Sequence, residues 1–205
     1  MPRSEALDTP HGRCVILELD EQDDLPPLVG GEHALAERLG PVRRRELAAG
    51  RAALRSALGI DAAILPDDRG APQLPAGWVG SISHKGLRAS AIVAPSGAGF
   101  VGVDIEVAAP PRMPIEKRIL TVAEQGRISD PREVTLHFSI KEAIYKAIDP
   151  IVRRYVGFTE VELVIGTNGS VSVTILDPSK LPVTVEAWWQ ERNGVWLATA
   201  RGQRR

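Results

Sequence analysis

Short apolar runs along the chain predict β-strands in both halves of the protein. In the first half they cover residues 14–20, 87–94 and 99–106, and a turn at Pro95-Ser96-Gly97 joins the last two. In the second half the predicted strands cover residues 158–165, 170–176, 183–189 and 195–200. Asn168-Gly169 and Asn193-Gly194 are hairpin-turn sequences, so we expect the neighbouring strands to be antiparallel.

Two longer segments have the spacing of amphipathic helices. Residues 42–58 place Leu47, Leu54 and Leu58 on one face, and Gly59 follows as a C-cap. Residues 136–148, LHFSIKEAIYKAI, form a second such pattern, and Asp149-Pro150 predicts its end. Shorter helical pieces are expected near residues 30–38 and 115–128, and residues 67–77 have the composition of a loop.

Each half therefore combines one long helix with several antiparallel strands. We predict an α+β fold that is a pseudo-dimer of two similar lobes, each a small antiparallel sheet packed with a long helix. The proline-rich segment 107–115 is the expected linker. The lobes would then span residues 1–106, with the arginine-rich helix, GSISHK and the strand ending in Asp-Ile-Glu, and residues 107–205, with FSIKEAIYKA and the later strands.

Composition narrows the class of protein. An apolar fraction of 43% in 205 residues is enough for a packed core, and a net charge of −1 argues against a general nucleic-acid binder. The single cysteine, Cys14, cannot form an internal disulfide, which fits a reducing compartment. There is no apolar signal sequence at the N-terminus and no run long enough to span a membrane. We therefore expect a cytoplasmic protein without a membrane partner.

Positive charge is concentrated in one segment. Between residues 38 and 55 there is one acid, Glu46, and six arginines: Arg38, Arg43, Arg44, Arg45, Arg51 and Arg55. Because acids elsewhere balance this excess, the segment indicates a patch that meets a small anion rather than a long polyanion.

The sequence VGVDIE, residues 101–106, ends with two acids on one face of a predicted strand, because residues i and i+2 point the same way. Asp104 and Glu106 would repel each other unless solvent or a cation screened them. Two solvated acids at a strand end are the simpler interpretation. The alternative is a Mg²⁺ site, which prefers oxygen ligands and substrate phosphates and would need a third ligand.

The helix at 136–148 offers that ligand. Glu142 and Lys146 share a helical face at i, i+4, and an ordinary surface ion pair would explain them. The remainder of the helix is largely apolar, however, and Lys141 is a third charge within it. A carboxylate between two lysines suits a phosphate–metal site, where it acts as metal ligand or base while the lysines bind phosphate oxygens.

Ser83 and His84 lie in GSISHK, which we interpret as a turn-like segment where hydroxyls, backbone N–H groups and an imidazole converge on an anion. A structural role for the histidine is the alternative. A serine-hydrolase triad is disfavoured because neighbours in sequence are poorly placed for it and no G-x-S-x-G is present. The other histidines lack zinc-ligand spacing, and there is no P-loop or dinucleotide-binding glycine motif.

Taken in order, these motifs resemble those of the 4′-phosphopantetheinyl transferases of the surfactin-synthase and enterobactin-synthase type. The family has, in the same order, an R-x-E-x-x-x-x-R-like helix matched within RRRELAAGR, a (K/R)-G-x-P loop matched by RGAP, and an S-(I/L)-(S/T)-H element. A (V/I)-G-(V/I)-D-(I/A)-E strand and an (F/W)-(S/C)-x-K-E-A-x-x-K helix follow. The resemblance runs from about Arg43 to Phe158 and is closer to the enterobactin-type branch.

The resemblance implies that the protein transfers the phosphopantetheine arm of coenzyme A to a serine of an acyl or peptidyl carrier protein. It also implies a two-lobed fold with coenzyme A in the cleft between the lobes. Asp104, Glu106 and Glu142 would hold Mg²⁺, Glu142 would accept the serine proton, and Lys146 would protonate or stabilise the leaving phosphate, with Lys141 supporting the pyrophosphate. The residues implied to bind coenzyme A are Arg43, Arg51, Arg69, Ser83, His84, Lys141 and Lys146. Arg44 or Arg45 would replace Arg43 after a small register shift.

Two other functions compete with this one. A Mg²⁺-dependent nucleotide or pyrophosphate hydrolase would use the same carboxylates. A non-catalytic coenzyme A-binding protein would bind its ligand through the same residues. The resemblance further implies a monomer, adenosine 3′,5′-bisphosphate as the second product, and a role in activating carriers, including those of secondary metabolite biosynthesis. It does not select a fatty-acid, polyketide, siderophore or antibiotic carrier.

Overall fold

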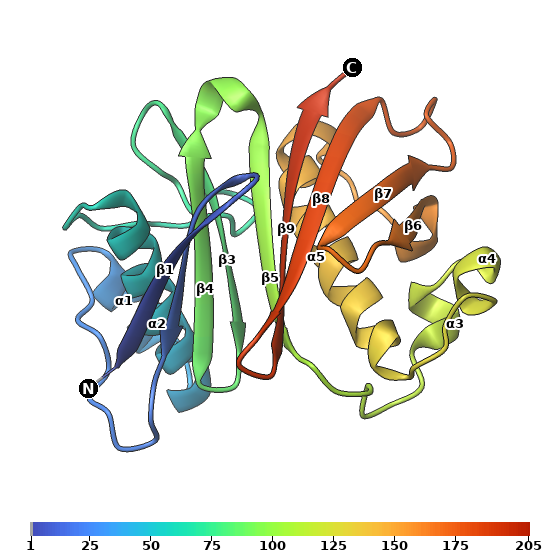
Figure 1. The fold of residues 1–205 in the computed structure, drawn as a ribbon. Coiled ribbons are helices and arrows are strands. Elements are labelled where there is room, and N and C mark those ends of the chain that lie inside the picture. Colours follow the sequence, from blue (N-terminus) through green and yellow to red (C-terminus); the bar gives the residue numbers. More distant parts are fainter. Residues whose placement is uncertain (1) are drawn as a thin grey trace. The chain divides into compact units, whose positions relative to one another are not determined.

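The protein is α+β, as predicted (Figure 1). A computed structural model describes residues 2–205, which divide into two compact units, the first ending at Gly97 and the second beginning at Ala98. Each unit has its own antiparallel sheet and its own long helix. The predicted lobe composition, a small sheet packed with a long helix, is therefore confirmed.

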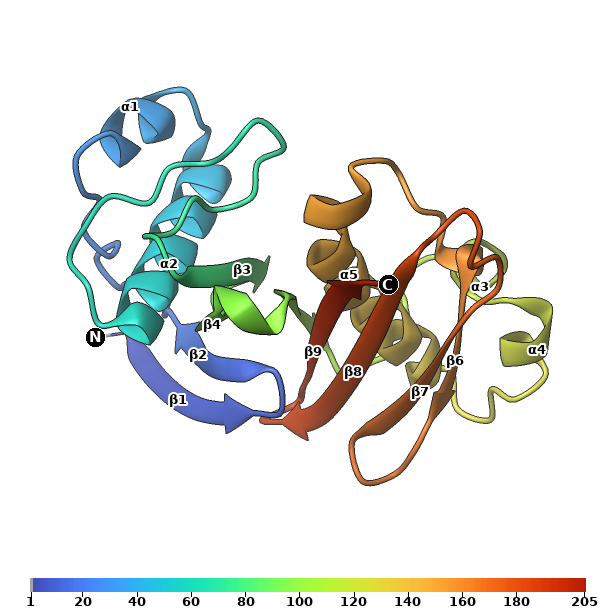
Figure 2. The same ribbon diagram turned by 90° about the horizontal axis from the view of Figure 1, so that it is seen from above.

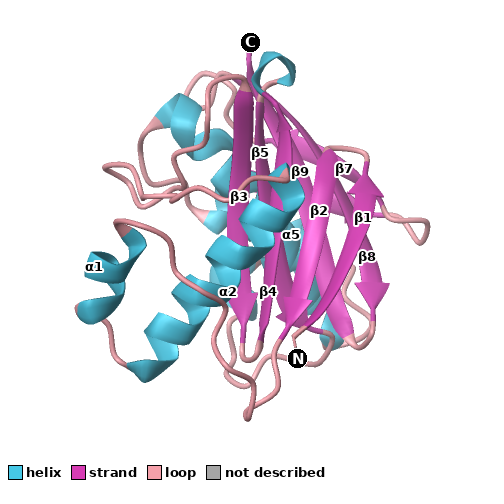
Figure 3. Ribbon diagram, turned by 90° about the vertical axis from the view of Figure 1, so that its left-hand side faces the viewer, coloured by secondary structure: helices cyan, strands magenta, loops and turns pink. Residues whose placement is uncertain are grey.

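The first unit contains a four-stranded sheet in the order β1-β2-β4-β3. Its strands are β1 (Arg3–Thr9), β2 (Gly12–Glu18), β3 (Trp78–Lys85) and β4 (Arg88–Pro95). The long helix α2 (Pro41–Leu58) lies across one face of this sheet, and the short helix α1 (Glu32–Glu37) precedes it (Figure 3). Gly59 ends α2 in the left-handed conformation, φ 68°, as its C-cap position predicted.

The second unit contains a five-stranded sheet in the order β5-β9-β8-β7-β6 (Figure 1). Figure 2 shows β9, β8, β7 and β6 of this sheet from above. Its strands are β5 (Phe100–Val107), β6 (Val161–Ile165), β7 (Ser170–Ile175), β8 (Val183–Arg192) and β9 (Val195–Arg204). Its helices are α3 (Glu116–Ile119), α4 (Val122–Gln125) and α5 (Arg132–Val152). The structure also has two short 3-10 helices, η1 (Ser96–Ala98) at the boundary between the units and η2 (Phe158–Glu160) in the second unit.

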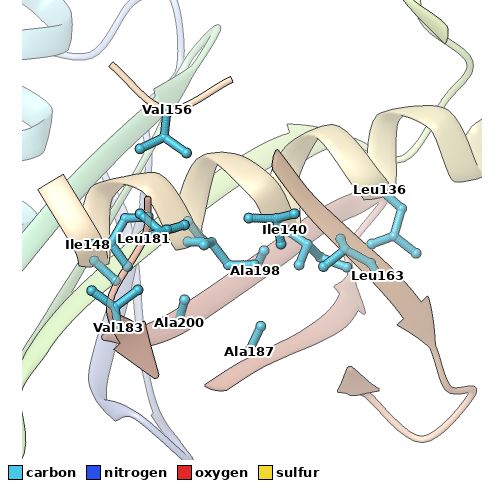
Figure 4. Close-up of a cluster of buried hydrophobic side chains, with 14 of the residues drawn as sticks. Leu136, Ile140, Ile148, Val156, Leu163, Leu181, Val183, Ala187, Ala198 and Ala200 are labelled. Atoms are coloured by element: carbon cyan, nitrogen blue, oxygen red, sulfur yellow. The ribbon is translucent and has the colours of Figure 1, made fainter. Parts of the chain in front are cut away.

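Each unit has a separate apolar core under its helix. In the first, Ala49, Ala53 and Leu54 of α2 pack on residues of β2 and β4. In the second, Ile140 and Ile148 of α5 face residues of β8 and β9 such as Val183 and Ala198 (Figure 4), and Ile144 belongs to the same cluster. Because burial of apolar surface is the main driving force of folding, each helix is held mainly by its own sheet.

The unit boundary differs from the expected one. The strand VGVDIE was placed at the end of the first lobe, but β5 pairs along its whole length with β9, from Phe100 opposite Gly202 to Val107 opposite Val195. Its acids therefore belong to the second unit, with the helix that carries Glu142. The proline-rich segment after residue 107 connects elements within that unit.

Four further features differ from the prediction. Strand β1 was not predicted because its apolar positions are few and its charged ones many, and GSISHK forms part of strand β3 rather than a turn. The helical piece at 115–128 is two short helices. Helix α5 extends beyond residues 136–148 in both directions, from Arg132 to Val152. At its C-terminal end it includes Pro150, which lies in the last turn, where the missing N–H removes only one bond. No helix within residues 2–205 is both long and apolar enough to span a membrane.

Gly102 allows α5 to approach β5. A Cβ atom added at this position would collide with the carbonyl oxygen of Ala143 and come within 2.8 Å of the Ala147 nitrogen, both in the backbone of α5. We expect Gly102→Ala to lower the free energy of unfolding by about 1–3 kcal/mol, since neither obstacle is a flexible side chain. Urea unfolding measures this. Gly97→Ala is the matched control, because an added Cβ there meets nothing within 4 Å, and an equal loss in both variants would contradict the packing argument.

Candidate active site

The strand acids of the second unit face helix α5. Gly102 contacts the α5 backbone, and Asp104 lies two residues further along β5 on the same face. The Asp104 side chain is 7% exposed, and its Oδ1 accepts a hydrogen bond from Lys146 Nζ at 2.8 Å. Lys146 Nζ also donates to the Val103 carbonyl at 3.0 Å. The sheet edge and the helix therefore meet through a partly buried ion pair.

Glu142 lies one helical turn before Lys146, within the electrostatic reach of both strand acids. Burial raises the pKa of Glu142 above that of an ordinary glutamate; the charge of Lys146 opposes this rise, and the charges of Asp104 and Glu106 add to it. The charge of Arg118 also opposes the rise, by a smaller amount. Three carboxylates and one ammonium group thus form one interacting cluster in the second unit.

The chemistry of this cluster fits a divalent cation, although its present geometry does not. Carboxylate oxygens are the ligands that Mg²⁺ prefers, and a cation would relieve the repulsion by Asp104 and Glu106 that adds to the effect of burial on the Glu142 pKa. Within residues 2–205, however, no three His, Cys, Asp or Glu side chains are arranged so that they could hold a metal ion. Lys146 Nζ supplies the positive charge beside Asp104. Metal binding would therefore require these side chains to turn.

Lys141 does not face this cluster, which corrects the expectation that it supports a pyrophosphate. Its side chain is fully buried, and Nζ donates to Glu124 Oε2 at 2.7 Å and to the carbonyls of Ile119 and Phe158 at 2.9 Å each. All three ammonium donors are thus used inside the protein. Burial lowers the pKa of Lys141, and the hydrogen bond to Glu124 opposes that shift. We therefore assign Lys141 a structural role.

In the first unit, Arg51 of α2 is a buried cation. Its residue is 7% exposed, and burial lowers its pKa, with Glu32 opposing and Arg55 reinforcing the shift. Glu32 is already held by Arg55, whose Nη1 lies 2.8 Å from both carboxylate oxygens. Among residues 2–205, no hydrogen-bond partner is found for the buried Arg51 Nε. Such a group is well suited to an anionic ligand.

Arg43 and His84 meet at one carboxylate. Glu46 Oε2 accepts from Arg43 Nη1 at 2.7 Å, and Glu46 Oε1 lies 3.4 Å from His84 Nδ1. Arg44 points elsewhere, because its Nε donates to the Ala36 carbonyl at 3.2 Å. Arg43 therefore shares a carboxylate with His84, whereas Arg44 contacts the backbone of α1.

Ser83 does not share a face with His84, contrary to the expected convergence. Both lie in the regular strand β3, opposite Ser90 and Ala89 of β4, and adjacent residues of a strand point to opposite faces. Ser83 is accordingly buried, whereas His84 is exposed. Arg69 lies in the loop 67–77, where its backbone N–H donates to Asp67 Oδ1 at 2.8 Å and its side chain is exposed.

Family comparisons cover most of the chain. Residues 31–94 match the 4′-phosphopantetheinyl transferase N-terminal domain, and residues 100–200 match the 4′-phosphopantetheinyl transferase superfamily. The chain belongs to the 4′-phosphopantetheinyl transferase family. The boundary between the two compact units lies in the short stretch between the two matches, residues 95–99. The protein is a transferase.

Curated relatives agree with this assignment. The transferase is 33% identical over 177 residues to 4′-phosphopantetheinyl transferase Svp of Streptomyces mobaraensis, covering 78% of this chain and 70% of the relative. It is 30% identical over 190 residues to 4′-phosphopantetheinyl transferase PptT of Mycobacterium tuberculosis, covering 81% and 82%. Among solved structures, holo-[acyl-carrier-protein] synthase from Neisseria meningitidis aligns with 51% of this chain and 97% of its own at 18% identity, with a TM-score of 0.42.

Three residues that interact with predicted site residues were not themselves predicted to have a role. Glu46 is the acid of the R-x-E-x-x-x-x-R-like motif but is given no role in the sequence analysis, although its i, i+3 spacing from Arg43 is a readable signal. The spacing of Thr121 and Glu124 is that of a capping box, but no sequence pattern indicates that Glu124 pairs with Lys141. Arg118 carries no signal at all, because only the fold brings its charge within reach of Glu142.

Proposed function

We propose that this transferase moves the 4′-phosphopantetheine arm of coenzyme A onto a serine of an apo acyl or peptidyl carrier protein. The reaction is Mg²⁺-dependent and releases adenosine 3′,5′-bisphosphate. The observation that carries the proposal is the cluster on β5 and α5, in which Lys146 bonds Asp104 while Glu142 interacts electrostatically with both. Relatives named as transferases of this arm support the choice of substrate.

The chemistry needs a base at the attacking serine and positive charge at the leaving phosphate. The serine oxygen attacks the phosphorus that bears the pantetheine arm, and the bond from that phosphorus to the oxygen of the adenosine 5′-phosphate breaks. Glu142 accepts the serine proton, and its raised pKa makes it a better base than an ordinary glutamate. Lys146 stabilises the charge that develops on the leaving phosphate oxygens.

Asp104, Glu106 and Glu142 are the residues that would hold Mg²⁺. When bound, the ion would neutralise pyrophosphate charge as a Lewis acid. The protein's own contribution is to keep three acids together near one cationic side chain, Lys146, which pairs with Asp104.

The first unit supplies the groups that we propose for binding the phosphates and the nucleotide end of coenzyme A. Arg51 is the strongest candidate, because it is buried and Glu32, the acid whose charge acts on it, is held by Arg55. Arg43, His84 and the exposed Arg69 are the others. The side chain of Ser83 is left out because it points to the opposite face of β3.

The decisive experiment incubates the protein with coenzyme A, Mg²⁺ and a panel of apo carrier proteins, and follows the mass of each carrier. Gain of the phosphopantetheine arm supports the proposal. Release of adenosine 3′,5′-bisphosphate without carrier modification would instead indicate a hydrolase. Tight coenzyme A binding with neither product would indicate a binding protein.

Asp104→Ala is expected to weaken activity and the response to Mg²⁺ together. Removing one carboxylate from the cluster should raise the Mg²⁺ concentration for half-maximal transfer at least about tenfold, a loss typical of altered metal sites. A Mg²⁺ titration of the transfer rate measures this. Asp8→Ala, an exposed aspartate on β1, is the control. An unchanged Mg²⁺ response in Asp104→Ala would remove this residue from the metal site.

A further inference from the structure

Glu46 lies between two cationic side chains from different elements. It belongs to α2 and its side chain is only 15% exposed. One carboxylate oxygen bonds Arg43 Nη1 at 2.7 Å, on the same helix, and the other lies 3.4 Å from His84 Nδ1, on β3. A helical i, i+3 pair would account for the first contact but not for the second, which crosses from helix to sheet.

Close packing of α2 on β3 explains how Glu46 reaches His84. Gly50 lies one helical turn after Glu46, and an added Cβ there would come within 2.7 Å of Ile82 Cγ2. Ile82 lies two residues before His84, on the same face of β3. Gly50 therefore allows α2 to lie close to β3. One helical turn from Gly50 and two strand residues from Ile82, the next pair of residues to face each other is Glu46 and His84.

The charge distribution on α2 indicates a role for the contact between Glu46 and His84. Glu46 is the only acid of the helix, which also carries Arg43, Arg44, Arg45, Arg51 and Arg55. A carboxylate beside an anion site repels the ligand, so Glu46 is poorly suited to touch a phosphate itself. It can hold Arg43 and His84 in one arrangement and lower the repulsion between them.

We propose that Glu46 is a positioning residue that holds Arg43 and His84 together for binding the phosphates of coenzyme A. The proposal rests on the proposed function. With His84 Nδ1 directed at Glu46, Nε2 lies on the far side of the imidazole ring. Arg43, whose side chain is 68% exposed, gains a fixed geometry that an arginine otherwise lacks at a helix surface.

The test compares Glu46→Ala and Glu46→Gln with the wild-type protein. Coenzyme A binding is measured by calorimetry, and KM and kcat are measured in the carrier-transfer assay. We expect Glu46→Ala to raise the Kd and the KM for coenzyme A about tenfold, the order of one hydrogen bond to a charged group, with kcat at saturation within about twofold. Glu46→Gln, which keeps an acceptor but no charge, should lie between. Glu37→Ala, an exposed glutamate of α1, is the matched control.

A double-mutant cycle identifies the route of the effect. If Glu46 acts through His84, Glu46→Ala should weaken coenzyme A binding much less in a His84→Ala background than in the wild type. The imidazole NMR signals of His84 should also shift in Glu46→Ala, which reports the contact without substrate. Wild-type affinity in Glu46→Ala, or full additivity in the cycle together with unshifted His84 signals, would overturn the proposal.

The failure of this inference is distinct from failure of the proposed function. A wild-type protein that binds coenzyme A but modifies no carrier refutes the transfer reaction, while the binding cycle still decides the role of Glu46. A wild-type protein that does not bind coenzyme A overturns both. If Glu46→Ala proves unfolded by circular dichroism, the near-isosteric Glu46→Gln decides the question.

Discussion

Glu142→Gln is expected to reduce carrier modification by at least about a hundredfold while leaving the fold intact. Glutamine has the same shape but cannot accept the serine proton, and a positioned general base contributes a factor of about 10²–10⁴. Carrier mass and single-turnover rates measure the loss. Near-normal turnover in this variant would rule out the role of Glu142 as a base.

The stability of the same variant provides an independent check. Burial raises the pKa of Glu142, which means that the folded protein holds the charged carboxylate less well than the unfolded chain does. At neutral pH this group therefore works against folding, and a neutral side chain should leave the urea midpoint unchanged or raise it. Glu133→Gln is the control on the same helix, because Glu133 lies in the first turn and bonds Ser129. Its activity should stay near that of the wild type.

Lys141→Met is expected to destabilise the second unit by about 3–5 kcal/mol, because it leaves the buried charge of Glu124 without its partner. The same change would also remove donors to the carbonyls of Ile119 and Phe158. Urea unfolding followed by tryptophan fluorescence measures this, since Trp188, Trp189 and Trp196 all lie in the second unit.

Two controls test whether the loss of stability comes from breaking a buried ion pair rather than from the substitution itself. Lys180→Met makes the same substitution in an exposed ion pair with Asp177, and we expect little change in the urea midpoint. Lys141→Met combined with Glu124→Gln should be more stable than Lys141→Met alone, because the glutamine removes the uncompensated charge and can still cap α4 at Thr121. Equal midpoints for Lys141→Met and Lys180→Met would contradict the structural role of Lys141.

Local patterns predicted the elements that carry strong periodicity or turn chemistry. Helix α2 and its Gly59 cap follow from leucine spacing, and the β8–β9 hairpin follows from Asn193-Gly194, both of which have positive φ. Strand β1 has no comparable pattern, because an exposed edge strand needs few apolar residues. The unit boundary was misplaced because β5 follows β4 in sequence but pairs with β9, a contact between residues about 100 positions apart.

For the candidate site, too, the sequence predicted some features and not others. Residue types and spacing were enough to single out Asp104, Glu142 and Lys146, and the fold brings them together. The direction of each side chain could not be read from the sequence. Lys141 is adjacent to Glu142 yet points into the interior, since neighbours on a helix are about 100° apart. The partnership of Glu46 with His84 likewise depends on how closely α2 packs on β3.

The interior position of the Lys141 ammonium group bears on inhibitor design. A molecule shaped against the second unit of this enzyme meets one reachable amine from the K-E-A-x-x-K motif, at Lys146, whose side chain is 28% exposed. An inhibitor with two acidic groups placed to pair with both lysines could pair only one of them, with Lys146. The other would find no partner, because the Lys141 side chain is not exposed to solvent.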